Sequence, residues 1–437
     1  MQRAKDFFKK EPVFVIAFLC AVLSMFLVPP SADYIGYIDF RVLELLFCLM
    51  AAVAGMQQEG VFLVLAQKIL AGKKSLRLLT LTLVMLPFFS SMLITNDVAL
   101  ITFVPFAVLV LELTGQTKHL AWVVTLQTIA ANIGSMLTPV GNPQNLYLSS
   151  FYQLAAGDFF AVTIPIVLLS FVLLALCCIA GKNHTIEVQF QKREEIQSKR
   201  ALLLFILLFL LSLLSVFHLL SSHIALVVTV IALAAFSPKV LKKVDYWLLA
   251  TFVCFFIFAG NIGAVEAVKN FLGNVLSQNT MLYSVLSSQV ISNVPAAVLL
   301  SNFTQDAKGM LLGTNIGGLG TLVASLASLI SFKIYAKTPK AEVLRYLGIF
   351  TSANVVMFCM DLQQFVYYKK KRRMKSWKEA KFGKPHRNIK TDITAVRRLS
   401  APTVKDWAWT KRPRFVQQKL MDWALQECFR PVAVSAV

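Results

Sequence analysis

Two apolar stretches of the chain are interrupted by polar triplets whose side chains could bind an ion or a small solute. The first triplet is Thr95-Asn96-Asp97, and the second is Ser292-Asn293-Val294. Amide, hydroxyl and carboxylate oxygens suit a small cation, whereas the backbone N–H groups that begin a helix favour an anion. The Asp97 carboxylate could also carry a proton. A capping role for Asn96 or Asp97 at the start of a helix is compatible with binding.

A longer polar segment, residues 132–145, breaks what would otherwise be one apolar helix. Such a break frees backbone N–H and C=O groups, which costs several kcal/mol in lipid unless a ligand or the protein satisfies them. The alternative is a packed kink at Pro139 and Pro143. The candidate binding residues here are Asn132, Gly134, Thr138, Pro139, Gly141, Asn142, Pro143, Gln144 and Asn145.

A second break, in residues 313–321, adds Thr314, Asn315 and Gly317 to the candidates. It lacks the Gly-Asn-Pro-Gln-Asn extension of the first break, residues 141–145. The sites at the two breaks should therefore differ.

The composition indicates that lipid is the solvent for these segments. Hydrophobic residues make up 57% of the 437 positions and charged residues only 15%, a balance typical of membrane proteins. No run alternates apolar and polar residues as a barrel strand would. We therefore predict an all-α polytopic membrane protein embedded in the lipid bilayer. About nine transmembrane helices are expected, at residues 13–28, 39–56, 120–149, 158–180, 201–219, 222–236, 245–262, 308–335 and 342–360.

The charge distribution predicts the topology. If residues 78–112 and 281–303 are re-entrant hairpins and the N-terminus is cytoplasmic, inner loops and ends hold 20 Lys and Arg, and outer loops hold only Lys269 and Lys308. Positive residues favour the cytoplasmic side, and counting either hairpin as one crossing would destroy this asymmetry. We expect a multi-pass protein of the bacterial cytoplasmic (inner) membrane.

Four landmarks of the first half return in the same order in the second half. They are Asp39 as Asp245, Ala54-Gly55 as Ala259-Gly260, Thr95-Asn96 as Ser292-Asn293, and Asn132-Ile133-Gly134 as Asn315-Ile316-Gly317. The matched crossings are five apart, so each pair runs in opposite directions, which is an inverted repeat of the kind that transporters use. The expected units are a first repeat at 1–181 with hairpin 78–112, a cytoplasmic basic linker at 182–200, a second repeat at 201–362 with hairpin 281–303, and a basic, poorly ordered tail at 363–437.

Other classes of function are not indicated. The net charge of +21 belongs mostly to the tail, which from Val366 onward holds 19 Lys and Arg against 5 Asp and Glu, so we expect no nucleic-acid partner. The seven cysteines form no C-x-x-C. No H-E-x-x-H, G-x-S-x-G or protease pair of acids is present, so an enzyme is not expected. No cofactor is expected apart from Na⁺ or H⁺ as a coupling ion.

Three motifs resemble the ion transporter superfamily, which includes divalent anion:sodium symporters, citrate carriers, arsenite permeases and sodium/proton antiporters. They are Ile94–Leu100, Thr138–Asn145 and Ser288–Pro295. The sequence is most similar to small uncharacterised bacterial anion permeases on the arsenite-permease and citrate-carrier side, over about residues 10–362.

That resemblance implies two half-sites and a homodimer. One half-site would combine Thr95, Asn96 and Asp97 with the 132–145 break, and the other would combine Ser292, Asn293 and Val294 with Thr314, Asn315 and Gly317. It also implies Na⁺ near Asn96, Asp97 and Asn293. Because Asp97 and Val294 replace a threonine of the symporters, H⁺ is an alternative coupling ion.

The sequence therefore predicts a secondary active transporter of a small anionic solute, either a carboxylate or an inorganic oxyanion, that works by alternating access. Arsenite-type efflux and Na⁺/H⁺ antiport are the alternatives within transport. An ion channel is the alternative from another class, and flux that fails to saturate with solute would identify it.

Overall fold

The structure is a computed structural model that describes residues 11–180, 183–190, 193–339 and 341–361. Among these residues, six helices are long and apolar enough to cross a membrane, and shorter apolar helices accompany them. A single two-stranded sheet is the only β structure in the same residues. The prediction of an all-α polytopic membrane protein is confirmed. The predicted tail, 363–437, lies outside the described residues.

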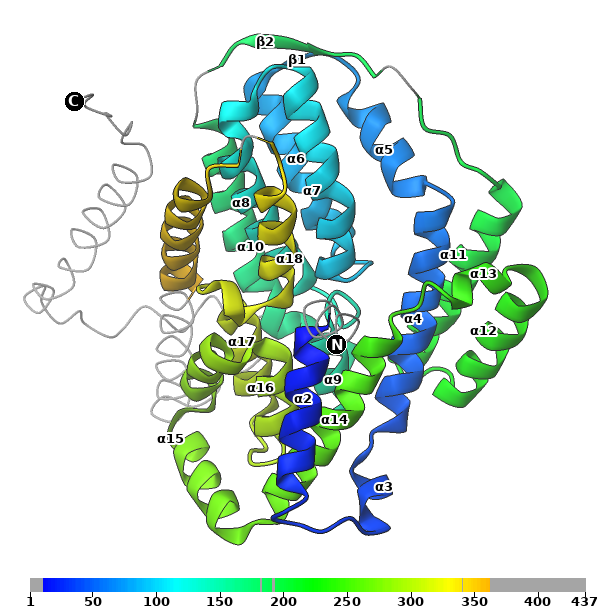
Figure 1. Ribbon diagram of the computed structural model, residues 1–437, viewed down its shortest axis with the longest axis vertical. Coiled ribbons are helices and arrows are strands. Elements are labelled where there is room, and N and C mark those ends of the chain that lie inside the picture. The colour runs from blue at the N-terminus through cyan, green and yellow to red at the C-terminus, as the bar shows by residue number, and fades with distance from the viewer. Residues whose placement is uncertain (1–10, 181–182, 191–192, 340, 362–437) are drawn as a thin grey trace, which may run out of the picture. The chain divides into compact units, whose positions relative to one another are not determined.

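The first half begins with helices that lead to a hairpin and a broken helix (Figure 1). The leading helices are α2 (Pro12–Ser24), α3 (Asp33–Tyr37), α4 (Phe40–Gln58) and α5 (Val61–Leu70). The hairpin is formed by α6 (Leu76–Ser90) and α7 (Asn96–Leu113). After η1 (Thr117–His119), the broken helix consists of α8 (Leu120–Ser135) and α9 (Pro143–Phe151), and α10 (Ala156–Ile179) follows.

The second half follows the same order. Its leading helices are α11 (Lys199–Val216), α12 (Ser222–Phe236), α13 (Pro238–Leu241) and α14 (Tyr246–Ala264). Its hairpin is formed by α15 (Glu266–Ile291), which has a kink at Asn279, and α16 (Asn293–Ser301). Its broken helix consists of α17 (Ala307–Gly317), η2 (Leu322–Ala324) and α18 (Leu326–Ala336), and an apolar helix follows at Val343–Asp361.

Matching aspartates begin matching helices in the two halves. One Asp39 oxygen accepts the Val42 N–H at 3.0 Å ahead of α4, and one Asp245 oxygen accepts the Leu248 N–H at 2.9 Å ahead of α14. The φ and ψ angles of the two caps are −80° and 88° in the first and −80° and 84° in the second. Each carboxylate satisfies an N–H group that has no partner inside the helix.

The two halves exchange packing partners. The first helix of each half packs on the second long helix of the other, so α2 contacts α14 and α11 contacts α4. Likewise, α7 packs on α18 and α16 packs on α9. Glycines permit the closest approaches, because Gly55 lies against the Phe205 ring and Gly260 against the Tyr37 ring. In Figure 1 the α6–α7 hairpin enters from the end that carries β1 and β2, and the α15–α16 hairpin enters from the opposite end.

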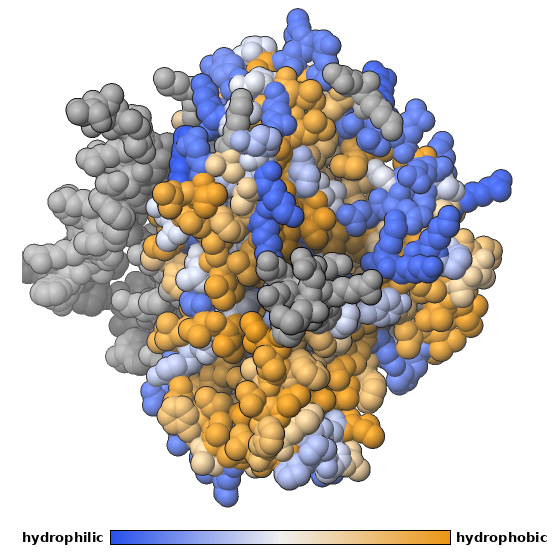
Figure 2. Space-filling view, in the orientation of Figure 1, coloured by the Kyte–Doolittle hydropathy of each residue, from blue (hydrophilic) through white to orange (hydrophobic). Residues whose placement is uncertain are grey.

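Two short strands lie outside the predicted crossings, and the sequence did not suggest them. Strand β1 (Gly72–Ser75) pairs antiparallel with β2 (Thr185–Val188), so the basic linker is partly a strand. The pairing requires both loops to lie on one side of the membrane, as the predicted topology has them. Figure 2 shows hydrophilic residues over this end and hydrophobic residues over the helices beyond it.

The contact between hairpin and broken helix depends on a missing side chain. Gly134 of α8 packs closely on α6. The Phe88 carbonyl oxygen of α6 lies where a Cβ on residue 134 would be. We expect Gly134→Ala to push the hairpin away and to destabilise the protein by about 1–3 kcal/mol, as overpacking does. The thermal unfolding midpoint of the detergent-solubilised protein measures this.

Gly157→Ala in α10 is the matched control, because a Cβ there would meet nothing within 4 Å. This variant should unfold at or slightly above the wild-type temperature, since alanine favours helix. Equal midpoints for the two variants would contradict the role given to Gly134.

Candidate solute site at the two helix breaks

The beginnings of α7 and α9 lie side by side in the first half. The Asn96 backbone N–H, at the start of α7, donates to the Gly141 carbonyl at 3.1 Å. The next residue, Asn142, caps α9 by accepting the Asn145 N–H at 2.9 Å. The hairpin tip and the first break therefore meet, and two positive helix ends point to one place.

The beginnings of α16 and α18 meet in the same way in the second half. The Ser292 hydroxyl donates to the Ala324 carbonyl, just ahead of α18, at 3.3 Å. Ser292 has φ 73° and ψ 156°, a conformation that glycine normally occupies and that costs about 1–3 kcal/mol in other residues. The Asn293 amide lies beside Gly318, 2.8 Å from where a Cβ would be. This tip therefore sits against the second break.

A buried asparagine joins the first hairpin tip to the second half. The Asn96 side-chain amide donates to the Asn132 side-chain oxygen at 2.9 Å. The Ser325 hydroxyl donates to that same oxygen at 3.1 Å, and the Asn132 amide donates to the Ser328 hydroxyl at 3.4 Å. Asn132 of α8 thus connects the start of α7 to the first turn of α18.

A second set of buried amides joins the two breaks directly. The Asn142 amide donates to the Asn315 side-chain oxygen at 3.3 Å, and the Asn315 amide donates to the Asn145 side-chain oxygen at 2.6 Å. The Asn145 amide in turn donates to the Ser135 and Thr138 carbonyls, both at 3.2 Å. Carbonyl groups freed by the first break are satisfied by a side chain that also contacts the second break.

Several other predicted site residues set the helix ends and the packing of these segments and do not bond to the buried asparagines. Pro143 is the first residue of α9, and Gly141 lies against the Ser135 backbone. Gly317 ends α17 against Ser288. Pro139 and Val294 are buried in the first break and in α16. Thr95 precedes α7 in an extended conformation and its side chain makes no capping hydrogen bond.

Two predicted hydroxyls are engaged locally. The Thr138 hydroxyl donates to the Met92 carbonyl at 2.5 Å, which ties the first break to the hairpin tip. The Thr314 hydroxyl donates to the Met310 carbonyl at 2.8 Å, one turn back in its own helix.

Asp97 and Gln144 are two of the predicted residues whose side chains keep free hydrogen-bonding capacity. The Asp97 carboxylate is half-buried and forms no hydrogen bond or ion pair with any other residue that the structure describes. The Gln144 side chain is buried and equally unengaged within the described chain. A carboxylate and an amide at the helix starts are groups that a solute, an ion or a proton could occupy.

The charge near the site comes from the helix ends, from Asp97 and from Asp245, whose carboxylate interacts electrostatically with that of Asp97. Within the described ranges, no lysine or arginine bonds to the central asparagines, which are Asn96, Asn132, Asn142, Asn145 and Asn315. No group of three or more His, Cys, Asp or Glu that could hold a metal ion occurs among the same residues. The prediction of Na⁺ near Asn96, Asp97 and Asn293 stays a prediction.

Sequence reasoning missed the partners of the predicted asparagines. Ser325 and Ser328 bond to Asn132, and the Gln289 amide donates to the Gly317 and Leu319 carbonyls at 2.7 and 2.9 Å. A signal for the serines was present, because they recur at three-residue spacing at the start of an apolar helix. Gln289 stands three residues before the second triplet and offered no periodic signal.

Comparison with known proteins relates the chain to transporters. A family model described as citrate transporter matches residues 8–311. An uncharacterised transporter of Methanocaldococcus jannaschii is 33% identical over 337 residues, which cover 76% of this chain and 90% of that protein. The inner membrane protein YbiR of Escherichia coli is 30% identical over 318 residues, 71% of this chain and 84% of its own. A silicon efflux transporter of Oryza sativa is 31% identical over 172 residues, 38% of this chain and 35% of its own.

The Asn315 side chain offers a direct test of the contact between the breaks. We expect Asn315→Leu to leave the Asn145 oxygen and one Asn142 N–H without partners in a buried setting, at about 1–3 kcal/mol for each group. The unfolding midpoint of the solubilised protein should fall clearly.

Thr314→Val is the matched control one residue earlier, because the hydroxyl that it removes bonds only within its own helix. Its midpoint should stay near that of the wild type. A midpoint of Asn315→Leu as high as that of the control would show that the amide bridge does not hold the two breaks together.

Proposed function

The chain belongs to the citrate transporter family, and we propose that it is a secondary active transporter that moves a small anion across the cytoplasmic membrane. The anion is a carboxylate or an inorganic oxyanion. The mechanism is alternating access, with Na⁺ or H⁺ as the coupling ion. The family and the relatives from Methanocaldococcus jannaschii and Oryza sativa are transporters by name, which supports transport as the activity and leaves the solute to be tested.

The observation that carries this proposal is the meeting of helix starts around the central asparagines. Helices α7, α9, α16 and α18 all begin there. The first N–H groups of a helix have no partner inside it, and the helix dipole adds partial positive charge at that end. An anion bound at such a place needs no lysine or arginine. It can therefore be released again into either aqueous phase.

Alternating access is supported by the exchange of packing partners between the halves. An inverted repeat gives two conformations of similar energy in which the halves trade roles. The contacts α2–α14 and α11–α4 are of this exchanged kind, as are α7–α18 and α16–α9. We propose a cytoplasmic N-terminus, in keeping with the 20 Lys and Arg of the inner loops and ends, and a homodimer as in similar transporters.

Export of an uncharged weak acid is the second candidate. It is favoured by the absence of lysine and arginine from the hydrogen bonds of the central asparagines in the described chain. Neutral amides and hydroxyls bind hydroxyl groups of a solute as readily as they bind one another. The similarity to a silicon efflux transporter points the same way.

A counterflow screen in proteoliposomes tests the proposal. Liposomes loaded with carboxylates, sulfate, phosphate, arsenite or silicic acid are diluted into the labelled solute, with and without Na⁺ and a pH gradient. We expect saturable exchange of at least one anion. Saturable exchange of arsenite or silicic acid alone supports the second candidate, and no saturable exchange of any solute refutes both.

Asp97→Asn tests the coupling ion. Because the carboxylate has no partner among the described residues, the amide should fit without loss of structure, and it can carry neither a charge nor an exchangeable acidic proton. We expect counterflow to remain and accumulation driven by an Na⁺ or H⁺ gradient to fall at least tenfold, as loss of the coupling site requires.

Asp158→Asn is the control, since Asp158 is an exposed residue whose carboxylate lies 3.6 Å from the Lys308 amine. It should leave both measurements unchanged. Full gradient-driven accumulation by Asp97→Asn would remove Asp97 from the coupling mechanism.

A further inference from the structure

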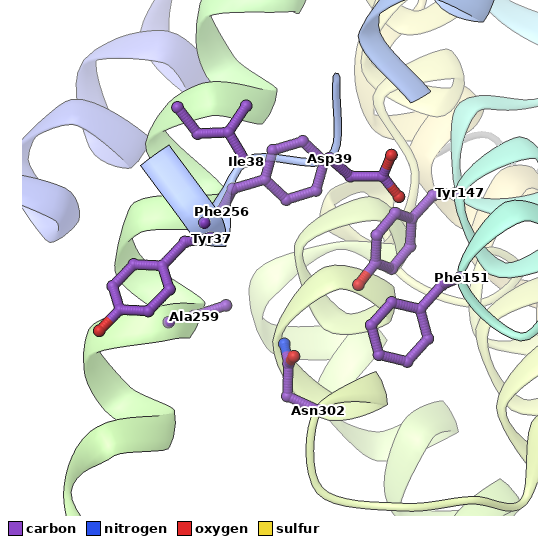
Figure 3. Close-up of a pocket in the computed structure, with 10 residues that line it drawn as sticks. Tyr37, Ile38, Asp39, Tyr147, Phe151, Phe256, Ala259 and Asn302 are labelled. Carbon is purple, nitrogen blue, oxygen red and sulfur yellow. The ribbon is translucent and has the colours of Figure 1, made fainter. Parts of the chain in front are cut away.

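A cavity of about 360 Å³ lies between the two halves, on the far side of α9 and α16 from the central asparagines. Figure 3 shows the side chains that face it. The walls come from the segment before α4, from α9, from α14 and from the residue that follows α16. The residues used below are Gly36, Asp39, Tyr147, Phe151, Phe256 and Asn302. In the proposed topology this cavity opens toward the outer solution.

The cavity lies at the C-terminal ends of α9 and α16. The N-terminal ends of these two helices lie at the central asparagines. Helix α9 ends at Phe151, and α16 ends at Ser301, next to Asn302. The C-terminal end of a helix carries partial negative charge, which favours a cation. The same two short helices thus present positive ends to the centre of the protein and negative ends to the cavity.

Asp39 is the one side chain among the lining residues that carries a formal charge at neutral pH. One of its oxygens accepts the Val42 N–H, and no ion pair involves Asp39 within the described residues. The nearby Arg41 attracts the carboxylate electrostatically and also donates its backbone N–H to it, but its guanidinium forms no ion pair there and donates to the Ser215 carbonyl of α11 at 3.2 Å. The carboxylate therefore keeps acceptor capacity for a ligand.

Aromatic rings form much of the remaining wall. The Tyr147 ring centroid lies 5.4 Å from that of Phe151 and 5.8 Å from that of Phe256. The Tyr147 and Ser301 hydroxyls form a hydrogen bond of 2.8 Å. Walls of low dielectric constant concentrate the field of a single charge, and ring faces attract cations.

We propose that this cavity is an outer vestibule that attracts a small monovalent inorganic cation, with Asp39 as the residue that draws it in. The inference rests on the proposed transport function, because an ion held here would lie beside the two helices that begin at the solute site. A cation at one end of α9 and α16 and an anion at the other would both be favoured by the same helix dipoles.

Cysteine labelling tests the sign of the electrostatic potential in the vestibule without measuring transport. The seven native cysteines are replaced, and Gly36→Cys serves as the probe, because a Cβ there meets nothing within 4 Å. Gly273→Cys in α15, equally unobstructed and outside the lining residues, is the reference. Right-side-out vesicles are treated with two impermeant methanethiosulfonate reagents, one bearing trimethylammonium and the other sulfonate.

We expect the ratio of cationic to anionic labelling rates to be about tenfold higher at Gly36→Cys than at Gly273→Cys, as one nearby carboxylate in a low-dielectric cavity would give. Asp39→Asn should bring the ratio down to the reference, and asparagine still caps α4. Asp245→Asn is the matched control, because it changes the equivalent cap in the other half and should leave the ratio unchanged.

Replacing N-methylglucamine chloride by NaCl, KCl or LiCl at constant ionic strength should slow the cationic reagent at Gly36→Cys with at least one of the three.

Equal ratios at the two cysteines, or no effect of Asp39→Asn, would overturn the proposal. Labelling of Gly36→Cys only in inverted vesicles would overturn the outer location, and no slowing by any of the three salts would overturn cation binding. Normal labelling in a protein that shows no counterflow would refute the transport function alone, so the two failures are distinguishable.

Discussion

A helix that stops inside a bilayer leaves backbone N–H and C=O groups that lipid cannot satisfy, and most of the architecture of this protein answers that constraint. The central asparagines satisfy some of these groups, and they form hydrogen bonds from one half to the other. Asn315 of the second break bonds to Asn142 and Asn145 of the first, and Asn132 bonds to Ser325 and to Ser328. Bonds within each half satisfy other groups of the two breaks, as the Asn145 amide does for the Ser135 carbonyl and the Gln289 amide for the Gly317 carbonyl, so both kinds of bond hold the breaks.

The same constraint shows how the proposed charged ligands could be held with few charged side chains. A buried lysine or arginine would be costly to desolvate and would bind an anion too firmly for rapid release. Short helices avoid this cost because their dipoles are fixed in the backbone. Helices α9 and α16 are nine residues each, so their positive and negative ends lie only about 14 Å apart at 1.5 Å per residue. Ligands of opposite sign at these ends would feel a common field.

The sequence predicted the segments that matter better than it predicted their contacts. Polar triplets and Gly-Pro breaks stand out against an apolar background, since each residue type is locally unfavourable in a membrane helix. Asn132 and Ser325 are 193 residues apart, and no local pattern specifies that pairing. The β1–β2 ladder has the same origin, because it joins a basic loop of the first half to the basic linker between the halves. The cavity beside Asp39 depends on four separate segments, so only their arrangement in space reveals it.

The two halves are not equivalent, and the differences concentrate the chemistry in the first half. Asn142 caps α9 with its side chain, whereas Ser325 ahead of α18 makes no capping bond and bonds instead to Asn132. Asp97 follows the first hairpin tip, and Val294 stands in its place at the second. The second half contributes Asn315, the serines and a strained Ser292 that position these groups. A transporter with two identical half-sites would hold two similar ligands. This arrangement instead places a carboxylate beside the amides in the first half alone, as expected if the proposed coupling ion and solute are bound by different groups.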